Sequence, residues 1–249
     1  MSSESHVLDN ACSTVVPSTS WSEVAIIETH SKAEWLVGQY NRQARLMTTV
    51  VNHHADHPGF AGITGLLAGL TMIPGRGVIA RLVADLAAVS ATDRVIDVGC
   101  GPGTAVREAA RRGARAIGVD PAPVMLRLAE ALTPPQAGIT WAEGAAENLR
   151  QPDASATVLW CVATVHHWQD VGMGLVEARR VLAPGGRLLA IERQVRPGAT
   201  GLASHGWTEQ QALSFAAQCR ATGFGDVRVE QHRPGRRALW TVRATRKAG

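Results

Sequence analysis

Apolar residues in the second half of the chain fall into short runs separated by stretches with helical spacing. Each run has the length of a buried strand, and the stretches between the runs repeat apolar residues every three or four positions. The runs occupy residues 94–98, 116–119, 139–142, 157–162 and 187–191. Strands that alternate with helices pair in parallel through right-handed crossovers. The pattern therefore predicts an α/β fold with a doubly wound, mostly parallel sheet.

Helices and a closing hairpin complete the expected fold. The helices are expected at residues 104–112, 123–132, 171–182 and 208–222, with a short additional piece near Ala146. Two further apolar runs, 227–231 and 238–243, face each other across residues 232–235, where a Pro-Gly pair is typical of a turn. This hairpin brings the expected sheet to seven strands.

The first 90 residues have a different pattern. Residues 1–20 are rich in Ser and Thr and show little periodicity, which is typical of a mobile tail. Helical spacing over 31–55, an apolar segment at 60–73 and an amphipathic stretch at 78–88 indicate helices. We therefore expect a tail at 1–20, an N-terminal helical extension at 21–90 and the sheet domain at 91–249.

Composition indicates which partners and which cellular compartment to expect. The 249 residues are 45% hydrophobic and carry a net charge of +4, with one Tyr and three Phe. Nucleic-acid binders show a stronger basic stripe with interleaved aromatic residues, so no nucleic-acid partner is expected. The four cysteines are far apart in the sequence, which favours a reducing compartment. The N-terminus lacks a secretory pattern and the most apolar stretch, 61–73, is too short to span a bilayer, so we expect a cytoplasmic protein without a membrane span.

A glycine-rich loop follows the first expected strand. Asp97 belongs to that strand, and Gly99, Gly101 and Gly103 lead directly into the next helix. Glycines let a backbone approach a ligand closely, and a helix N-terminus offers unpaired N–H groups. A dinucleotide fingerprint that starts at Gly99 needs a glycine at position 104, where Thr104 stands, and no Gly-Lys-Ser/Thr follows to make a P-loop. The loop therefore predicts a ligand site of another kind.

Asp120 ends the second expected strand, at the same edge of the sheet as the glycine loop. Its carboxylate is suited to accept charge-assisted hydrogen bonds from both hydroxyls of a ribose. The same position also suits the N-cap of the next helix. The residues alone leave both roles open.

Five segments in this order resemble the class I S-adenosylmethionine-dependent methyltransferases. They read VIDVGCGPGT, GVDPAPVML, GAAENL, HHWQD and RVLAPGGRLLAIE, and the similarity extends over residues 90–245. The resemblance is to the small-molecule branch that includes enzymes of ubiquinone and menaquinone biosynthesis. It implies a Rossmann-like methyltransferase fold, an N-terminal helical lid over the cofactor, and S-adenosyl-L-methionine as that cofactor.

The resemblance also assigns cofactor contacts to residues of this chain. It implies that Asp97 and the loop of Gly99, Gly101 and Gly103 hold the methionine part of the cofactor. It further implies that Asp120 binds the ribose.

The adenine would meet four other residues. Pro121 and Met125 are expected near the ring, and the backbone at Ala145 and Ala146 is expected at its edge.

Two positions depart from the family pattern. Ala145 stands where the family usually has an Asp that accepts from the adenine amino group, so that contact is missing or made by a group such as Glu143 or Glu147. Thr157 replaces a familiar acid before the fourth strand.

His166 follows the fourth expected strand, where related small-molecule O-methyltransferases carry a catalytic His. An ordinary imidazole, with a pKa near 6.5, accepts a proton at neutral pH. His166 is thus a candidate general base, and a structural or substrate-positioning role fits the same position. His167 and Asp170 are expected to be loop and helix-cap residues.

A second histidine cluster lies upstream. His53 and His57 are four positions apart, which on a helix is the spacing of metal ligands. No Cys or Glu completes an evident site, so a polar helix end is the preferred interpretation and no metal is expected.

Together these features predict an enzyme that transfers a methyl group from S-adenosylmethionine to an O or N atom of a small metabolite, natural product or lipid-like molecule. Two alternatives stay open. One is a non-catalytic sensor or assembly module that keeps the cofactor pocket. The other is an RNA methyltransferase, which only the isoelectric point near 9.2 supports. A homodimer is compatible with these features, and the identity of the acceptor is not predicted.

Overall fold

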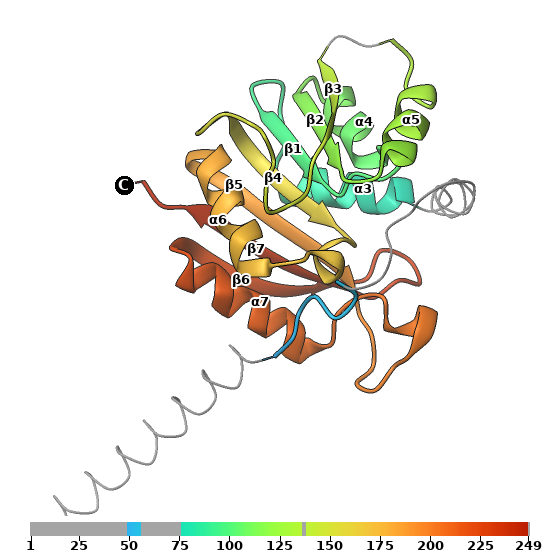
Figure 1. The fold of residues 1–249 in the computed structure, drawn as a ribbon, viewed down its shortest axis with the longest axis vertical. Helices are drawn as coiled ribbons and strands as arrows, with labels where there is room; N and C mark the ends of the chain where they lie inside the picture. Colours follow the sequence, from blue (N-terminus) through green and yellow to red (C-terminus); the bar gives the residue numbers. More distant parts are fainter. Residues whose placement is uncertain (1–48, 56–75, 136–137, 249) are drawn as a thin grey trace, which may run out of the picture. The chain divides into compact units, whose positions relative to one another are not determined.

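Seven strands form one sheet in the order β3-β2-β1-β4-β5-β7-β6 in the computed structural model, which describes residues 49–55, 76–135 and 138–248 (Figure 1). The strands are β1 (Arg94–Val98), β2 (Arg115–Asp120), β3 (Ile139–Glu143), β4 (Ala156–Val162), β5 (Leu182–Arg193), β6 (Phe224–His232) and β7 (Leu239–Arg246). The helices are α3 (Arg76–Leu86), α4 (Thr104–Arg111), α5 (Pro123–Ala131), α6 (Val171–Val181) and α7 (Glu209–Ala221), with short 3-10 turns η1 (Val165–His167) and η2 (Gly201–Ser204).

The sheet is mixed, with one antiparallel strand. β1 to β5 pair in parallel, while β7 runs antiparallel between β5 and β6. The strand order reverses at β1, because β2 and β3 follow on one side and β4 and β5 on the other. Ligands of doubly wound sheets bind at the carboxyl ends of the strands beside such a reversal. The predicted fold class and the closing hairpin are confirmed.

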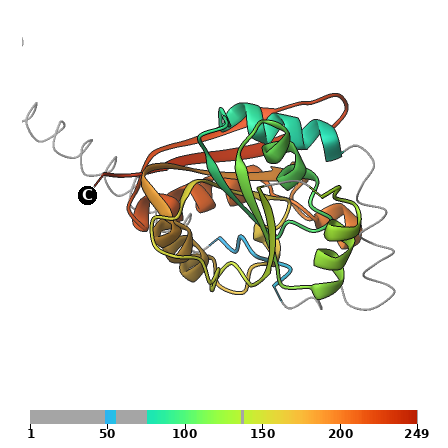
Figure 2. The same ribbon diagram turned by 90° about the horizontal axis from the view of Figure 1, so that it is seen from above.

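Alternating residues of the central strands face two separate apolar cores. In β4, Leu159 and Cys161 pack towards α6 and α7, while Val158 and Trp160 pack towards α3 and α4. This period of two is what a strand buried on both faces requires. Figure 2 shows α3 on the opposite side of the sheet from α6 and α7.

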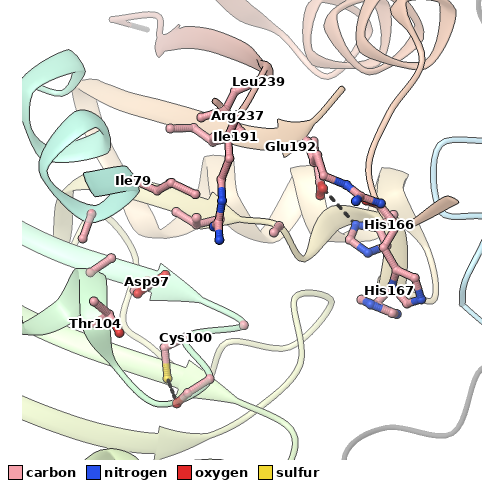
Figure 3. A pocket seen from close by; sticks show the side chains of 18 of the residues that line it. Ile79, Asp97, Cys100, Thr104, His166, His167, Ile191, Glu192, Arg237 and Leu239 are labelled. Atoms are coloured by element: carbon pink, nitrogen blue, oxygen red, sulfur yellow. Dashed lines mark hydrogen bonds and ion pairs between the residues drawn. The ribbon is translucent and has the colours of Figure 1, made fainter. Parts of the chain in front are cut away.

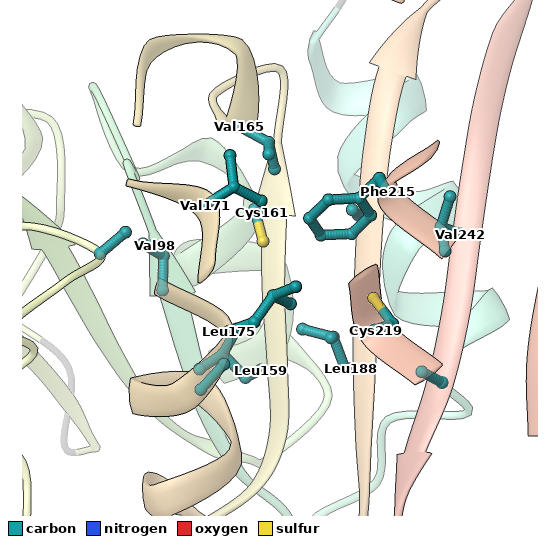
Figure 4. Packing of buried hydrophobic residues seen from close by; sticks show 14 of the residues in the cluster. Val98, Leu159, Cys161, Val165, Val171, Leu175, Leu188, Phe215, Cys219 and Val242 are labelled. Carbon is teal, nitrogen blue, oxygen red and sulfur yellow. The ribbon is translucent and has the colours of Figure 1, made fainter. Parts of the chain in front are cut away.

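Phe215 and Cys219 of α7 and Leu175 of α6 close the larger core against β4 and β5 (Figure 4). All three are fully buried. Side chains of this size contribute roughly 1.5–3 kcal/mol each when they leave water. The two helices are thus held on the sheet mainly by apolar packing.

Thr157, which replaces a family acid, joins the first residues of β1 and β4. Its hydroxyl donates to Oδ1 of Asp93 at 2.7 Å and accepts from the backbone N–H of Arg94 at 2.9 Å. Burial acts to raise the pKa of Asp93, but hydrogen bonds from Thr157 and Ser90 and the charge of Arg187 bring that pKa below its ordinary value. Thr157 therefore stabilises the starts of β1 and β4, at the edge of the sheet opposite the glycine loop.

The short helix expected near Ala146 is absent, and that prediction is wrong. A turn stands in its place, in which Ala145 and Asn148 form an isolated bridge and the N–H of Asn148 donates to the carbonyl of Ala145. The N–H of Leu149 donates to Glu177 of α6 instead of continuing a helix. Contacts outside the segment thus satisfy its backbone.

Residues 49–55 are a turn-rich segment and not the end of a helix, which corrects the expectation for this part of 31–55. Their carbonyls accept from side chains far along the chain: Thr49 from Ser214, Val50 from Gln211 and Val51 from Trp207. These tertiary hydrogen bonds replace the helical ladder.

Parts of the other expectations lie outside the described residues. These parts are the tail at 1–20, most of the extension at 21–90 including the apolar segment 60–73, and His57. Within the extension, α3 packs through Ala80, Val83 and Ala84 into the core shared with α4. No helix in the described ranges is long and apolar enough to cross a membrane.

Candidate functional site

A cavity of about 880 Å³ opens at the carboxyl edge of the sheet, beside the reversal of strand order. Figure 3 shows Asp97, Cys100 and Thr104 at one end and Glu192, His166 and His167 at the other. Apolar side chains also line the cavity, among them Ile79, Val162, Ile191, Leu202 and Leu239. A single cavity therefore joins the glycine loop to the histidine that follows β4.

The glycine loop turns tightly at the end of β1. Gly99, Gly101 and Gly103 have φ values of 68°, 53° and 76°, in the left-handed region that suits glycine. A Cβ on Gly99 would stand 2.0 Å from Oγ1 of Thr164, and one on Gly103 would stand 2.3 Å from the ring of Trp141. Both glycines are thus required by close packing, and Gly99 and Gly101 also line the cavity.

Asp120 holds this loop in place from the end of β2. Its Oδ2 accepts from the N–H of Gly101 at 2.8 Å, and its Oδ1 accepts from the N–H of Ala122 at 2.9 Å. It lines the cavity and is 7% exposed. A carboxylate has about four acceptor sites, which suits a residue that holds a loop and faces a cavity. The N-cap of α5 is Ala122, so Asp120 is not the N-cap of this helix.

Thr104 is the first residue of α4 and offers a polar atom to the cavity. Its Oγ1 is shielded from solvent and has no hydrogen-bond partner among the described residues. Asp97, 2% exposed, lies at the same end. A buried hydroxyl is costly unless a partner satisfies it. A polar ligand seated at the start of α4 fits these residues.

Cys100 lies beside this loop as a neutral thiol. Burial, together with the charges of Asp97 and Asp120, raises its pKa well above the ordinary value. Because the thiolate is the nucleophilic form, Cys100 is not suited to attack a substrate.

Only one of the four residues that were expected near the adenine lines the cavity. Met125 of α5 lines the cavity, but Pro121, Ala145 and Ala146 are not among the lining residues. Glu147 is occupied elsewhere, since its Oε1 accepts from the N–H of Asp170 at 3.0 Å.

His166 and Glu192 form a buried pair at the other end of the cavity. Nδ1 of His166 lies 2.9 Å from Oε2 of Glu192, and Oε1 of Glu192 accepts from the N–H of Val165 at 3.0 Å. Both side chains are almost fully buried. Ala163, with φ of 55°, turns the chain between β4 and η1. The carboxylate favours a proton on Nδ1, which leaves Nε2 as the acceptor nitrogen.

Four other histidine rings surround His166. His53, His54, His167 and His205 have ring centroids 4.2 to 5.9 Å from that of His166. Burial, and then the neighbouring His166 and His205, lower the pKa of His167 to about 3. This ring is therefore neutral at physiological pH and lines the cavity.

Other sequence expectations have clear outcomes. Asp170 is the N-cap of α6 and accepts from the N–H of Met173, which confirms the predicted cap. His53 lies in the turn-rich segment and bonds to Ser204 and Gln211.

Among the lining residues that sequence reasoning did not single out, Glu192, His205 and Arg237 carry polar side chains. Glu192 had a signal, because it follows an apolar strand at the edge where ligands bind. His205 and Arg237 lie in loops whose path no periodicity predicts.

Comparisons with known proteins agree on one family. Residues 96–190 match a model described as a methyltransferase domain. A demethylmenaquinone methyltransferase of Tropheryma whipplei is 35% identical over 114 residues, which are 45% of this chain and 46% of that protein. A ubiquinone biosynthesis O-methyltransferase of Azorhizobium caulinodans is 34% identical over 98 residues, 39% of this chain and 38% of that protein. The chain thus spans less than half the length of these curated relatives.

A solved structure agrees with the fold. A SAM-dependent methyltransferase from Aquifex aeolicus has a TM-score of 0.60 at 16% identity, over 72% of this chain and 97% of that chain. Residues 96–190 of this chain therefore match a methyltransferase domain, and the fold is that of a solved SAM-dependent methyltransferase.

Proposed function

We propose that the protein transfers the methyl group of S-adenosylmethionine to an oxygen or nitrogen atom of a small molecule. The observation that carries the proposal is the single cavity between the loop of Gly99 and Gly101 and the buried pair of His166 and Glu192. One end offers hydrogen-bonding groups to a nucleoside-like ligand. The other end offers a group that takes up a proton. Methyl transfer to a hydroxyl uses a bound methyl donor and a group that accepts the hydroxyl proton.

The cofactor would lie against Asp97, Gly99, Gly101, Thr104, Asp120 and Met125, all of which line the cavity. The ribose hydroxyls would donate to the carboxylate of Asp120, and Oγ1 of Thr104 would gain the partner it lacks within the described ranges. Gly103 supports the loop from behind through its contact with Trp141. Pro121, Ala145 and Ala146 stay outside the proposed set.

S-adenosylmethionine, when bound, supplies a methyl group on a sulfonium sulfur, a leaving group that needs no further activation. The chain's own residues then align the acceptor, exclude water and remove a proton where one is lost. His166 would take the proton of a hydroxyl acceptor at Nε2, while Glu192 keeps the other nitrogen protonated. An amine acceptor would not require this base.

The acceptor is proposed to be an apolar or aromatic small molecule. Ile79, Val162 and Leu239 are among the apolar lining residues of the cavity, and Arg236 and Arg237 line it as well. Relatives named for menaquinone and ubiquinone biosynthesis are compatible with this class.

Calorimetry with S-adenosylmethionine tests the cofactor site. Asp120→Ala is expected to weaken binding by tenfold or more, which is roughly 1.4 kcal/mol. Asp153→Ala is the matched control, because Asp153 pairs with Arg180 and does not line the cavity. Equal affinities for the wild type and for Asp120→Ala, with both proteins folded by circular dichroism, would contradict the proposed ribose contact.

A panel of small-molecule acceptors tests the activity. Release of S-adenosylhomocysteine with one of them would support methyl transfer. A protein that binds the cofactor and turns over none of the panel would instead be the non-catalytic binding module.

A further inference from the structure

Three histidines from two separate loops converge at the acceptor end of the cavity. His166 and His167 come from η1, and His205 follows η2. One ring nitrogen of each lies within 4.8 Å of the others. All three residues line the cavity. The arrangement depends on the tertiary structure, because His205 is far from the other two in sequence.

The surrounding groups orient these rings as they would orient metal ligands. Nδ1 of His166 faces Oε2 of Glu192 at 2.9 Å, which leaves Nε2 for a further partner. A metal-bound imidazole almost always gives its second nitrogen to a carboxylate or a backbone carbonyl. Glu192 gives His166 support of the first kind.

Arg193 fixes the third histidine through its own loop. Its guanidinium donates to the carbonyls of Leu202, Ala203 and His205 at 2.8 to 2.9 Å. The charge is thus directed at backbone oxygens, and the loop that carries His205 is tied to the end of β5.

The other two rings of the cluster form its wall. The ring nitrogens of His53 bond to the carbonyl of Ser204 and to the side-chain amide of Gln211. Nε2 of His54 lies 3.1 Å from Oγ of Ser204. His53 is therefore committed to the protein at both nitrogens.

We propose that His166, His167 and His205 bind a divalent transition-metal ion, zinc, with the fourth position open to the cavity. Three imidazoles with an open position are a ligand set of catalytic zinc, whereas magnesium and calcium prefer oxygen ligands. Zinc–nitrogen bonds of about 2.0–2.1 Å require the rings to draw together by roughly an ångström. Rotation of the partly buried His167 and His205 would provide this shift.

The role of the metal rests on the proposed methyl transfer, whereas zinc binding by itself does not. A hydroxyl acceptor would coordinate at the open position, and the metal would lower the pKa of its O–H group. The proton would leave to solvent, and the oxygen would then form its bond to the methyl carbon as the sulfur–methyl bond breaks. Nε2 of His166 would then be a ligand in place of a base.

The test is a titration with zinc alone, on the full chain without a histidine tag and after removal of metal by a chelator. We expect one tightly bound zinc per chain, and a visible absorption spectrum typical of tetrahedral cobalt when cobalt replaces it. His205→Gln is expected to weaken zinc binding by on the order of 10²-fold or more, and Glu192→Gln by 10–100-fold. His232→Gln is the matched control, since it removes one imidazole outside the cluster and should bind like the wild type.

His167→Gln provides a second ligand variant, and thermal melting of each metal-free variant checks its folding. Zinc binding by the wild type that is no tighter than binding by folded His205→Gln and His167→Gln would overturn the proposal. Calorimetry with S-adenosylmethionine on the same samples separates this result from a failure of the proposed function, because the glycine loop around Cys100, which Asp120 contacts, lies at the other end of the cavity.

Discussion

At the scale of single residues, Glu192 sets which nitrogen of His166 carries a proton. The carboxylate of Glu192 accepts hydrogen bonds from Nδ1 of His166 and from the N–H of Val165. It therefore holds the ring and the start of η1 together. Both side chains are buried away from solvent. The chemistry of Nε2 therefore depends on a residue that does not itself need to touch the acceptor.

Glu192→Gln tests this dependence. A Gln can keep its oxygen on the N–H of Val165, but its amide would then donate to Nδ1 and place the ring proton on Nε2. The lone pair of Nε2 would be lost, whether it serves as the base or as a zinc ligand. With a hydroxyl acceptor, kcat is expected to fall on the order of 10²-fold or more with little change in cofactor affinity. His166→Ala should show a similar loss.

Glu177→Gln serves as the control for this change. Glu177 bonds to Arg180 and to the backbone of Leu149, and it does not line the cavity. Steady-state rates and calorimetry measured together separate a change in kcat from a change in binding. Wild-type turnover by Glu192→Gln would return His166 to a structural role.

At the scale of elements, the strand-to-helix turn between β1 and α4 is the part that its own sequence specifies best. The boundaries of β1 agree with the expectation, and α4 begins at Thr104 as expected. Gly99 is required there for two reasons, its φ of 68° and the approach of Thr164. The sequence showed the glycine but not the threonine, because Thr164 belongs to another strand end.

Gly99→Ala and Gly198→Ala separate these two reasons. Both residues have φ in the left-handed region, but a Cβ on Gly198 meets no atom within 4 Å, whereas a Cβ on Gly99 meets Oγ1 of Thr164 at 2.0 Å. Gly198→Ala is expected to lower the free energy of unfolding by about 1–2 kcal/mol. Gly99→Ala should cost about 1–3 kcal/mol more and should also weaken cofactor binding. Urea unfolding of both variants measures the difference, and equal losses would show that the contact with Thr164 is relieved at no cost.

Elements that depend on distant partners were predicted less well. The turn around Ala146 was mistaken for a helix, because its small residues suit a helix and the bond from Leu149 to Glu177 is not visible locally. Residues 49–55 were expected to end a helix, because their hydrogen bonds to distant side chains are likewise not visible locally. Local propensity was overridden by hydrogen bonds to other segments.

At the scale of the whole molecule, residues 49–55 close one side of the histidine cluster. Nδ2 of Asn52 donates to the carbonyls of Trp168 and Gln169 at 2.8 and 3.0 Å. The N–H of His54 donates to the carbonyl of His166 at 2.9 Å, and Val51 is buried in the larger core. The segment thus connects α7 to the loop after β4.

Asn52→Ala should loosen this connection. The loss of two hydrogen bonds is expected to lower the free energy of unfolding by about 1–3 kcal/mol. Hydrogen exchange at the amides of residues 49–55 and 165–169 should become faster. Asn148→Ala is the control, since the side chain of Asn148 has no hydrogen bond within the part of the chain that the structure describes. Unchanged exchange at 165–169 would show that the segment does not hold the cluster.

The sequence by itself determined the α/β class, the seven strands, the glycine loop and the position of Asp120 at the ligand edge. Apolar periodicity and glycine spacing are local properties, so they can be read along the chain. Only the tertiary structure decided that Glu192 meets His166, that His205 joins His166 and His167, and that Pro121, Ala145 and Ala146 do not line the cavity. These pairings join segments far apart in the sequence, and they depend on how β4, β5 and their loops pack together.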